Sequence, residues 1–578
     1  MEKRWVLAPK PNPEQVDSLA SVVNINTSLA ALLVQRGITD FDQAKAFFRP
    51  ELTHLHSPFL MQDMEKAVIR VIEAIDNQQK ILIFGDYDVD GTTAVSLVYS
   101  FLQEIYPNNI DYYIPDRYTE GYGVSYRAID WAADNGFSLI IALDCGVKSV
   151  AHVDYANQKG VDFIICDHHL PDTVLPAAVA VLDPKRADCQ YPYKELSGCG
   201  VGFKLMQAFC ERKNIEPERL YPYLDLVVVS IASDIVPITG ENRVLAFWGL
   251  KQVCTAPRVG LKALLDVAGF SPSEMTGRYD LQISHLVFGV GPRINAAGRI
   301  AHAKAAVELL LEKDETKAAE CAKNINLRND ERRDFDSNIT QEALEMIETD
   351  PFLQKSKSSV LFRPDWHKGV VGIVASRCIE KYYRPTIILT ESNNKATGSA
   401  RSVEGFDVYE AISACADLLE QYGGHTHAAG LTMPLQNVEK FRQRFEQEVT
   451  ARITEAQLVP QIEIDGVLML NQITQKFYNI IKQMSPFGPA NMQPVFMSEN
   501  VTDTGYSRVL EGKNGKYEHL KISIRQADGT TANGIAFGMA EFYPKIAEGK
   551  PFKLCYTIEE NNFRGNISLQ LMVKDIQF

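Results

Sequence analysis

The sequence contains no long apolar run and no regular cysteine pattern. No stretch reaches the roughly 18 apolar residues of a transmembrane helix, and Met1–Arg4 leads into no run of signal-peptide length. The ten cysteines include no C-x-x-C pair, and several, such as Cys145 and Cys166, lie in apolar runs. This usage indicates a reducing compartment. We therefore expect a cytoplasmic protein with buried free thiols and no membrane partner.

The sequence also lacks an excess of positive charge. Its 59 Lys and Arg face 73 Asp and Glu, which gives a net charge of −14. This balance argues against a protein that coats nucleic acid by bulk charge, so any DNA contacts should be concentrated in few places. No internal repeat stands out. The 578 residues suffice for three or four domains, and the hydrophobic content of 46% is ordinary for a globular protein.

An acidic hexapeptide, Asp86-Tyr87-Asp88-Val89-Asp90-Gly91, is the most informative stretch that is present. It follows the apolar run 81–85, which is typical of a buried strand, and precedes a helical pattern over 94–106 that Thr92 and Thr93 can cap. Three neighbouring carboxylates repel one another unless a cation lies among them. Hard divalent ions supply that charge and accept oxygen ligands.

Two other interpretations of this hexapeptide are open. A calcium loop of the EF-hand type also begins D-x-D-x-D-G, but its twelfth position should be Glu and is here Leu97. A strand also precedes the loop where an EF-hand has a helix. The second alternative is a solvated acidic turn without a ligand.

Three further apolar runs end in acidic residues or histidine. The run 137–143 is followed by Asp144, the run 161–166 by Asp167-His168-His169, and the run 226–232 by Ser233 and Asp234. The runs 137–143 and 161–166, together with the run 81–85, fit parallel strands that alternate with helices. Ligands of open α/β sheets bind at the carboxyl ends of the strands. We therefore expect these side chains to converge on one crevice with the hexapeptide.

These motifs resemble motifs I to IV of the DHH phosphoesterase family. From about Ala67 to the C-terminus the chain is similar to the RecJ branch of that family, whose members are exonucleases specific for single-stranded DNA. The resemblance implies an α/β fold: a DHH parallel-sheet domain, a long connecting helix, a DHHA1 α/β domain and a C-terminal OB-like β-barrel. The expected boundaries are 1–60 for an N-terminal helical segment, 61–300 for DHH, 301–350 for the connecting helix, 351–455 for DHHA1 and 460–578 for the barrel.

The resemblance also implies a site for two metal ions. Asp86, Asp88 and Asp144 would hold one ion, and Asp90, Asp144, His168 and Asp234 would hold the other. Asp86 stands where the wider family often has His, which favours Mn²⁺ or Mg²⁺ over softer metals. Asp144, His168, His169 and Asp167 form the expected catalytic set. In it, Asp167 orients a neighbouring group, and His169 contacts the phosphate or protonates the leaving oxygen.

Candidate substrate-binding residues lie in four other stretches. Arg117 and Tyr122 belong to a Gly-, Tyr- and Arg-containing loop that suits phosphate and base contact. The remaining candidates are Arg293 and Asn295 between glycines, Ser399 and Arg401 in a small-residue loop, and His425 after Gly423-Gly424. In the barrel, Lys516, His519, Lys521 and Arg564 are candidates for contact with single strands. For each barrel residue a solvated face is the competing interpretation.

The sequence thus predicts metal-dependent hydrolysis of single-stranded DNA in DNA repair and recombination. The 5′ to 3′ direction rests on the resemblance alone. One alternative is a DHH enzyme for small molecules, such as an oligoribonuclease, a cyclic-dinucleotide phosphodiesterase or a pyrophosphatase. Another is a non-catalytic DNA-binding scaffold. The expected partners are single-stranded DNA, single-strand-binding protein and a helicase, and the expected state is a monomer.

Overall fold

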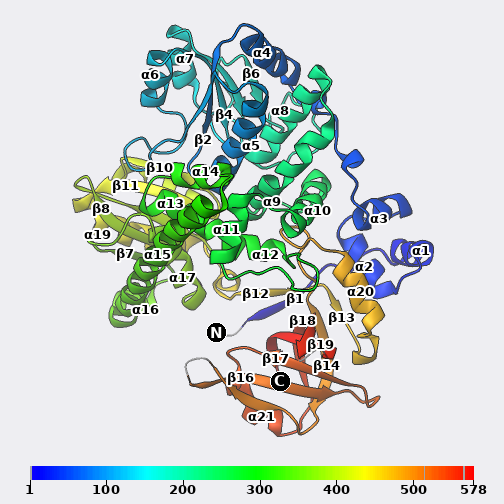
Figure 1. The fold of residues 1–578 in the computed structure, drawn as a ribbon. Coiled ribbons are helices and arrows are strands. Elements are labelled where there is room, and N and C mark those ends of the chain that lie inside the picture. The colour runs from blue at the N-terminus through cyan, green and yellow to red at the C-terminus, as the bar shows by residue number, and fades with distance from the viewer. Residues whose placement is uncertain (1–2, 513–514, 564–565) are drawn as a thin grey trace. The chain divides into compact units, whose positions relative to one another are not determined.

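The chain folds into two compact units in a computed structural model that describes residues 3–512, 515–563 and 566–578. The first unit comprises residues 50–335 and 486–491, and the second comprises residues 1–49, 336–485 and 492–578. Figure 1 labels their helices and strands. Each unit is described by itself below.

The first unit is built on a five-stranded, entirely parallel sheet with the order β3-β2-β4-β5-β6. Its strands are β2 (Lys80–Gly85), β3 (Ile110–Tyr113), β4 (Phe137–Leu143), β5 (Asp162–Cys166) and β6 (Ala180–Leu182). Alternate residues of the central strands enter two different apolar cores. Ile81 and Ile83 pack with α4, α5 and α8, whereas Leu82 and Phe84 pack with α6 and α7. Because both faces are covered, these strands are almost continuously apolar.

Helices make up most of the rest of the first unit. They are α4 (Met64–Asp76), α5 (Val89–Ile105), α6 (Tyr126–Asp134), α7 (Val150–Gln158), α8 (Gly198–Lys213), α9 (Leu224–Ser233), α10 (Gly240–Thr255), α11 (Val259–Val267), α12 (Ile283–His285), α13 (Gly291–Ile300), α14 (Lys304–Leu311) and the first part of α15 (Glu315–Thr349). The long connecting helix expected over 301–350 is therefore the pair α14 and α15.

One local prediction in this unit needs correction, and two stretches that the sequence left unassigned are helical. Thr92 and Thr93 do not cap a helix; they lie inside α5, and their hydroxyls donate to the carbonyls of Asp88 and Val89, four residues back. The apolar run 226–232 is the middle of the buried helix α9. The glycine-flanked stretch 291–299 is helix α13. Short apolar runs do not distinguish a buried helix from a buried strand.

The second unit contains a mixed sheet with the order β10-β11-β9-β8-β7. Its strands are β7 (Ser359–Phe362), β8 (Thr386–Ser392), β9 (Lys395–Arg401), β10 (Gln421–His425) and β11 (Ala428–Pro434), and its helices are α16 (Pro351–Lys355), α17 (Val371–Lys381), α18 (Val408–Ser413) and α19 (Val438–Arg452). The predicted loop around Ser399 and Arg401 is instead strand β9. A Cβ at Gly398 would lie 2.0 Å from the carbonyl oxygen of Ile388, so the small residues serve close strand packing.

A closed β-barrel forms the C-terminal part of the second unit. Strands β14, β18, β19, β17 and β16 follow one another, and the pairing of β14 with β16 closes the ring. The elements of this region are β12 (Gln461–Ile464), β13 (Gly466–Val467), α20 (Gln475–Gln483), β14 (Phe496–Asp503), β15 (Arg508–Glu511), β16 (Tyr517–Arg525), β17 (Thr531–Ala536), α21 (Tyr543–Ala547), β18 (Phe552–Phe563) and β19 (Asn566–Gln577). A five-stranded closed ring is the OB architecture that the sequence predicts.

The N-terminal segment is more than a pair of helices. Besides the expected α2 (Thr27–Gln35) and α3 (Phe41–Phe48), it contains α1 (Pro13–Val23) and the strand β1 (Arg4–Leu7). Strand β1 pairs in parallel with β12, and the Trp5 indole N–H donates to the Asp575 carboxylate over 2.8 Å. The segment therefore belongs to the fold of the second unit.

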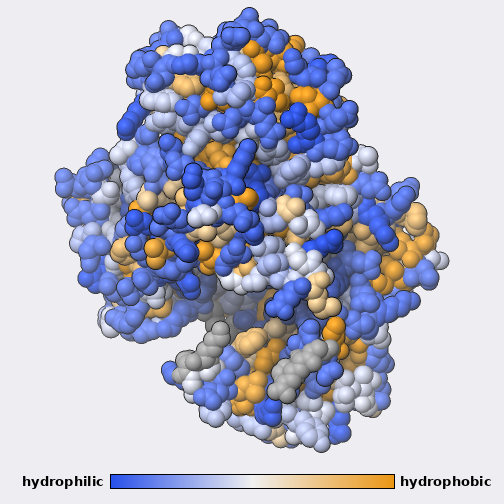
Figure 2. Space-filling model, viewed as in Figure 1, coloured by the Kyte–Doolittle hydropathy of each residue, from blue (hydrophilic) through white to orange (hydrophobic). Residues whose placement is uncertain are grey.

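Apolar side chains are mostly inside the units, and the face in Figure 2 is largely hydrophilic with scattered apolar groups. All ten cysteines are free, as predicted, and eight of them are buried. Within the described ranges, no single helix is both long and apolar enough to cross a membrane. Only α1 and α2 taken together, across a bend of 116°, meet that criterion of length and composition.

Candidate active site

The acidic hexapeptide forms the junction between β2 and α5. Asp86 directly follows the strand, and the Asp88 carboxylate caps the helix by accepting the N–H of Gly91 over 3.0 Å. Asp90 lies in the first turn of α5 and is fully buried. A Cβ at residue 91 would lie 2.3 Å from the Asp86 carbonyl oxygen, so only glycine allows the chain to fold back this tightly. The turn thereby holds three carboxylates close together.

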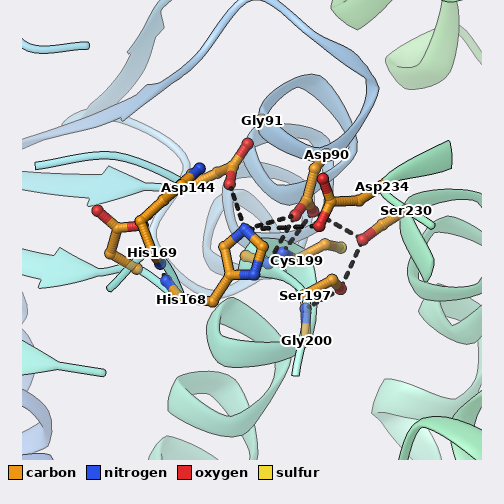
Figure 3. Close-up of polar contacts among 12 residues, drawn as sticks. Asp90, Gly91, Asp144, His168, His169, Ser197, Cys199, Gly200, Ser230 and Asp234 are labelled. Atoms are coloured by element: carbon orange, nitrogen blue, oxygen red, sulfur yellow. Dashed lines mark hydrogen bonds and ion pairs between the residues drawn. The ribbon is translucent and has the colours of Figure 1, made fainter. Parts of the chain in front are cut away.

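Protein donors occupy both oxygens of Asp90. The N–H groups of Gly198 and Cys199, at the start of α8, donate over 2.6 and 2.7 Å, and the Ser230 hydroxyl of α9 donates over 2.6 Å (Figure 3). A helix N-terminus is a favourable place for negative charge. The glycine-containing start of α8 therefore holds a carboxylate of the site, which is a more specific role than the helix packing that the sequence indicates.

Asp144 follows β4 in a left-handed backbone conformation, with φ of 59°. Its N–H donates to the Cys166 carbonyl over 2.8 Å, so the neighbouring strand β5 fixes the turn. The residue packs closely against α8, where a Cβ at Gly198 would lie 2.6 Å from the Asp144 Cβ. Non-glycine residues with positive φ are concentrated at functional sites.

His168 lies among three of the predicted ligands. Its Nε2 is 3.2 Å from Asp144 Oδ1, 3.6 Å from Asp234 Oδ2 and 3.7 Å from Asp90 Oδ2. Neither ring nitrogen has a hydrogen-bond partner, although the residue is buried. Burial lowers the pKa of this imidazole, which favours the neutral form that binds metals.

Three overlapping groups in this region offer donor atoms within 4.8 Å of one another. They are Asp86, Asp88 and Asp144; Asp90, His168 and Asp234; and Asp144, His168 and His169. The first two groups correspond to the two ion sites implied by the family resemblance. Buried atoms without partners, Asp86 Oδ1 and Asp144 Oδ1 as well as the two His168 nitrogens, lie in these groups. Carboxylate oxygens with one imidazole suit hard or borderline divalent ions. The residues therefore fit the metals.

The electrostatics of the site favour bound cations. Burial first, and then neighbouring carboxylates, raise the pKa of Asp86, Asp88 and Asp144 above the usual range. Burial and the charges of Asp90 and Asp88 raise the pKa of Asp234 to about 8. The cluster therefore cannot carry all its negative charges at neutral pH unless positive charge enters it.

His169 and Asp167 form a pair beside the ion groups. The Asp167 carboxylate contacts His169 Nδ1 at 2.7 Å and accepts the N–H groups of His168 and Val147 over 2.8 and 2.9 Å. Burial alone would lower the pKa of His169, but the hydrogen bond to Asp167 raises it to about 9. Burial likewise opposes ionisation of Asp167, yet the His169 contact brings the pKa of Asp167 below its ordinary value. His169 is therefore protonated at neutral pH.

Tyr122 and Arg117 lie near the same site in the first unit. The Tyr122 hydroxyl is 3.4 Å from the Asp144 carbonyl oxygen and 3.4 Å from His169 Nε2. The Arg117 guanidinium lies over the Tyr87 ring, 4.9 Å from its centroid. Tyr87 belongs to the acidic hexapeptide, so this loop extends to the site.

Arg293 has partners within the protein. Its guanidinium donates to the Asn326 side chain over 2.9 Å and to the carbonyls of Gly289 and Val267 over 2.6 and 3.2 Å. These contacts join α13 to α15 and to the end of α11, which is a structural role. Asn295 lies on the same helix α13 and is half-buried. The structure gives no support to phosphate contact by either residue.

Ser399, Arg401 and His425 meet in the second unit. Arg401 and His425 both lie beside Ala428 in the strand register, and the Arg401 guanidinium donates to Ser399 Oγ over 2.7 Å. Burial lowers the pKa of Arg401. Among the residues that the structure describes, no carboxylate lies within ion-pair distance of Arg401. This half-buried cation on a strand therefore carries a positive charge that no carboxylate of the described residues neutralises.

Outward-facing basic and aromatic residues occur on the barrel. Lys521 of β16 is opposite Arg508 of β15, and the His519 ring lies 5.1 Å from the Phe537 ring. Lys516 is also exposed. The predicted candidate Arg564 lies outside the described residues.

Sequence reasoning missed Ser197, Ser230 and Lys185. The two serines form hydrogen bonds around Asp90. Burial lowers the pKa of His168 and Lys185 adds to this effect, whereas burial raises the pKa of Asp234 and the charge of Lys185 partly opposes that rise. A buried serine inside an apolar helix has no distinguishing pattern. The run Ser197-Gly-Cys-Gly-Val-Gly202 was a usable signal, because serine before a helix is a preferred cap.

Three family models match the chain. The N-terminal domain of the DHH family matches residues 80–231, the DHHA1 domain matches residues 355–451, and the RecJ OB domain matches residues 464–575. These matches and the folds described above confirm the predicted fold class.

Named relatives match the chain over almost its whole length. The chain is 36% identical to the single-stranded-DNA-specific exonuclease RecJ of Bacillus subtilis over 99% of this chain and 70% of that protein. It is 35% identical to the exonuclease of the same name from Haemophilus influenzae, over 91% of this chain and 92% of that protein.

Solved structures agree with these matches. The crystal structure of RecJ from Thermus thermophilus with Mn²⁺ superposes with a TM-score of 0.84 at 25% identity and covers 100% of this chain and 79% of that one. A structure of exonuclease RecJ bound to manganese gives a TM-score of 0.59 at 30% identity, over 70% of this chain and 98% of that one.

Proposed function

The chain belongs to the RecJ family of single-stranded-DNA-specific exonucleases, and from this membership we propose that it hydrolyses phosphodiester bonds of single-stranded DNA in the first unit, using two Mn²⁺ or Mg²⁺ ions. The observation that carries the proposal is the pair of ligand groups that meet at the 3.2 Å contact between Asp144 and His168, with buried donor atoms that lack protein partners. Solved relatives contain Mn²⁺ or Mg²⁺.

The acidic residues and His168 of the first unit are the proposed metal ligands. Asp86, Asp88 and Asp144 would hold one ion, and Asp90, His168 and Asp234 would hold the other. The Asp144 carboxylate lies 3.2 Å from His168 and so adjoins both groups. Two such ions, when bound, neutralise charge on the scissile phosphate and lower the pKa of bound water. The protein supplies the geometry, because Asp86, Asp90, Asp144 and His168 are buried and need little reorganisation, while Asp88 and Asp234 are half-buried.

His169 supplies a proton near the leaving oxygen. It is protonated at neutral pH through its contact with Asp167, and its ring lies beside the ligand groups. Asp167 holds the ring by Nδ1, and the Tyr122 hydroxyl lies at similar distances from the two ring nitrogens, 3.5 Å from Nδ1 and 3.4 Å from Nε2. A positioned imidazolium of this kind suits general acid catalysis.

We propose that Ser399 and Arg401 bind the terminal 5′-phosphate and so give 5′ to 3′ polarity. An end differs from the interior of a strand by extra charge, and a guanidinium without an ion-pair partner in the described ranges is available for it. Wild type should prefer a 5′-phosphate over a 5′-hydroxyl, and Arg401→Ala should lose most of that preference. Arg377→Ala is the control, because Arg377 already pairs with Asp336 at 2.8 Å. Equal discrimination by the Arg401 variant and wild type would place the phosphate site elsewhere.

The surroundings of the enzyme are also proposals. Family membership supports a cytoplasmic monomer in DNA repair and recombination, with single-strand-binding protein and a helicase as partners. The domain boundaries 61–300, 351–455 and 460–578 remain predictions, since the matched ranges are shorter. Purified protein with Mn²⁺, given single strands, duplex DNA and di-adenylates, separates the exonuclease from a small-molecule phosphodiesterase and from a scaffold.

A further inference from the structure

Asp90 differs from the other carboxylates in how completely the protein holds it. Oδ2 accepts the Gly198 N–H, and Oδ1 accepts both the Cys199 N–H and the Ser230 hydroxyl. Asp86 Oδ1 and Asp144 Oδ1, by contrast, have no partner. One carboxylate of the second ion group is therefore fixed before any ion binds.

The Ser230 hydroxyl lies in a chain of hydrogen bonds. Its oxygen is 2.6 Å from Asp90 Oδ1 and 2.6 Å from Ser197 Oγ, and Ser197 Oγ accepts the Gly200 N–H over 3.1 Å (Figure 3). A carboxylate only accepts, so Ser230 donates to Asp90. The contact between Ser230 and Ser197 joins this pair to the start of α8, where Ser197 accepts the Gly200 N–H.

We infer that Ser230 is a positioning residue for the second metal ion, acting through Asp90, with Ser197 supporting it from the start of α8. Both serines are fully buried, so water cannot replace either hydroxyl. With Ser230 and Cys199 on Oδ1, the carboxylate presents Oδ2 toward His168, 3.7 Å away. Groups that orient a ligating carboxylate typically change metal affinity about 10- to 100-fold when removed.

The decisive comparison is Ser230→Ala against Ser96→Ala in the full-length protein. Ser96 is equally buried in α5, but its hydroxyl donates only to the Thr92 carbonyl over 2.7 Å. Mn²⁺ is titrated by calorimetry into EDTA-treated, dialysed protein, and electron paramagnetic resonance reports whether two coupled ions form. We expect Ser230→Ala to bind the ion of the Asp90 group about tenfold less tightly than Ser96→Ala does, and to lose the signal of two coupled ions. A difference smaller than about threefold overturns the inference.

A second variant covers the case in which Ser230→Ala does not fold. Ser197→Ala leaves Asp90 all its donors and removes only the group that orients Ser230. The affinity for the ion of the Asp90 group is expected to fall about two- to threefold, while the affinity for the other ion stays unchanged. An unchanged affinity for the ion of the Asp90 group contradicts the inference. The inference rests on the proposed two-ion site. Failure of wild type to cleave single-stranded DNA while binding two Mn²⁺ ions contradicts the proposed function and not the role of Ser230.

Discussion

Replacing Asp234 by asparagine is expected to stabilise the protein when no divalent ion is present. Burial, followed by the charges of Asp90 and Asp88, raises the pKa of Asp234 from 3.8 to about 8. The folded protein keeps a proton that the unfolded chain releases, so wild-type stability falls as the pH rises from about 4 to about 8. Asparagine has a similar shape and no charge, so the stability of the variant does not fall over this pH range for this reason.

The size of the gain follows from the pKa shift. One pKa unit corresponds to about 1.4 kcal/mol, and about three units separate 3.8 from pH 7, so the upper bound is about 4 kcal/mol. Protonation of any neighbouring carboxyl relieves the others, so about 2 kcal/mol is the expected gain. For a unit of about 290 residues, with an unfolding entropy of about 2.1 cal/mol/K per residue, that corresponds to a rise in Tm of about 3 °C.

The assay is thermal unfolding of EDTA-treated wild type and Asp234→Asn at about pH 7 and about pH 4, where the linkage predicts a large and a small difference. Asp172→Asn is the control, because Asp172 is an exposed carboxylate of the same unit that contacts only Lys148, at 3.6 Å. With added Mn²⁺, wild type should have the higher Tm of the two, because it keeps the Asp234 ligand and is stabilised more by the ion. Equal Tm values for wild type and Asp234→Asn at neutral pH, or the same gain at both pH values, would refute the reasoning.

Three other substitutions have expected outcomes. Asp144→Ala should abolish hydrolysis in a folded protein, because one ion group loses a ligand and the other loses the carboxylate 3.2 Å from His168, and wild-type turnover would rule out the two-ion site. Ile235→Gly should raise stability by about 0.5–1 kcal/mol, because a β-branched residue that is 64% exposed occupies a φ of 58°; a lower Tm would contradict this. Arg508→Ala with Lys521→Ala should weaken binding of long single strands, reduce the salt slope by about 1.4 and leave polarity unchanged; an unchanged slope would exclude the barrel face.

Point substitutions test the barrel better than truncation. A protein ending near Val459 would lose residues 486–491, which belong to the first unit, where the Pro489 carbonyl accepts the Ile238 N–H over 2.8 Å. It would also lose β12, the partner of β1. Removal of the barrel therefore damages both units.

The metal site was predictable because its signals are local. An apolar strand of about six residues followed by Asp can be read from the sequence, and parallel strands bring such ends to one edge of a sheet. Asp86, Asp144 and the pair His168 and His169 were found in this way. Asp234 was found by the family motif, although the element before it is helix α9 and not a strand.

Features that depend on distant neighbours were not predictable. Strand β9 contains Gly398 and Ala400, which indicate a loop, but it is held between β8 and β11 by partners remote in sequence. Ser230 and Ser197 become meaningful only when α8 and α9 pack around Asp90. Thr92 and Thr93 are typical capping residues, but Asp88, a predicted metal ligand, caps α5.

The most direct test is cleavage of single strands labelled at the 5′ or the 3′ end by EDTA-treated protein to which Mn²⁺ is returned. Without the ion there should be no product. With it, the 5′ label should appear first as a mononucleotide, duplex DNA should remain intact, and Asp144→Ala should be inactive under the same conditions. Cleavage in EDTA, early release of the 3′ label or equal digestion of duplex DNA would contradict a two-ion, single-strand-specific 5′ to 3′ exonuclease.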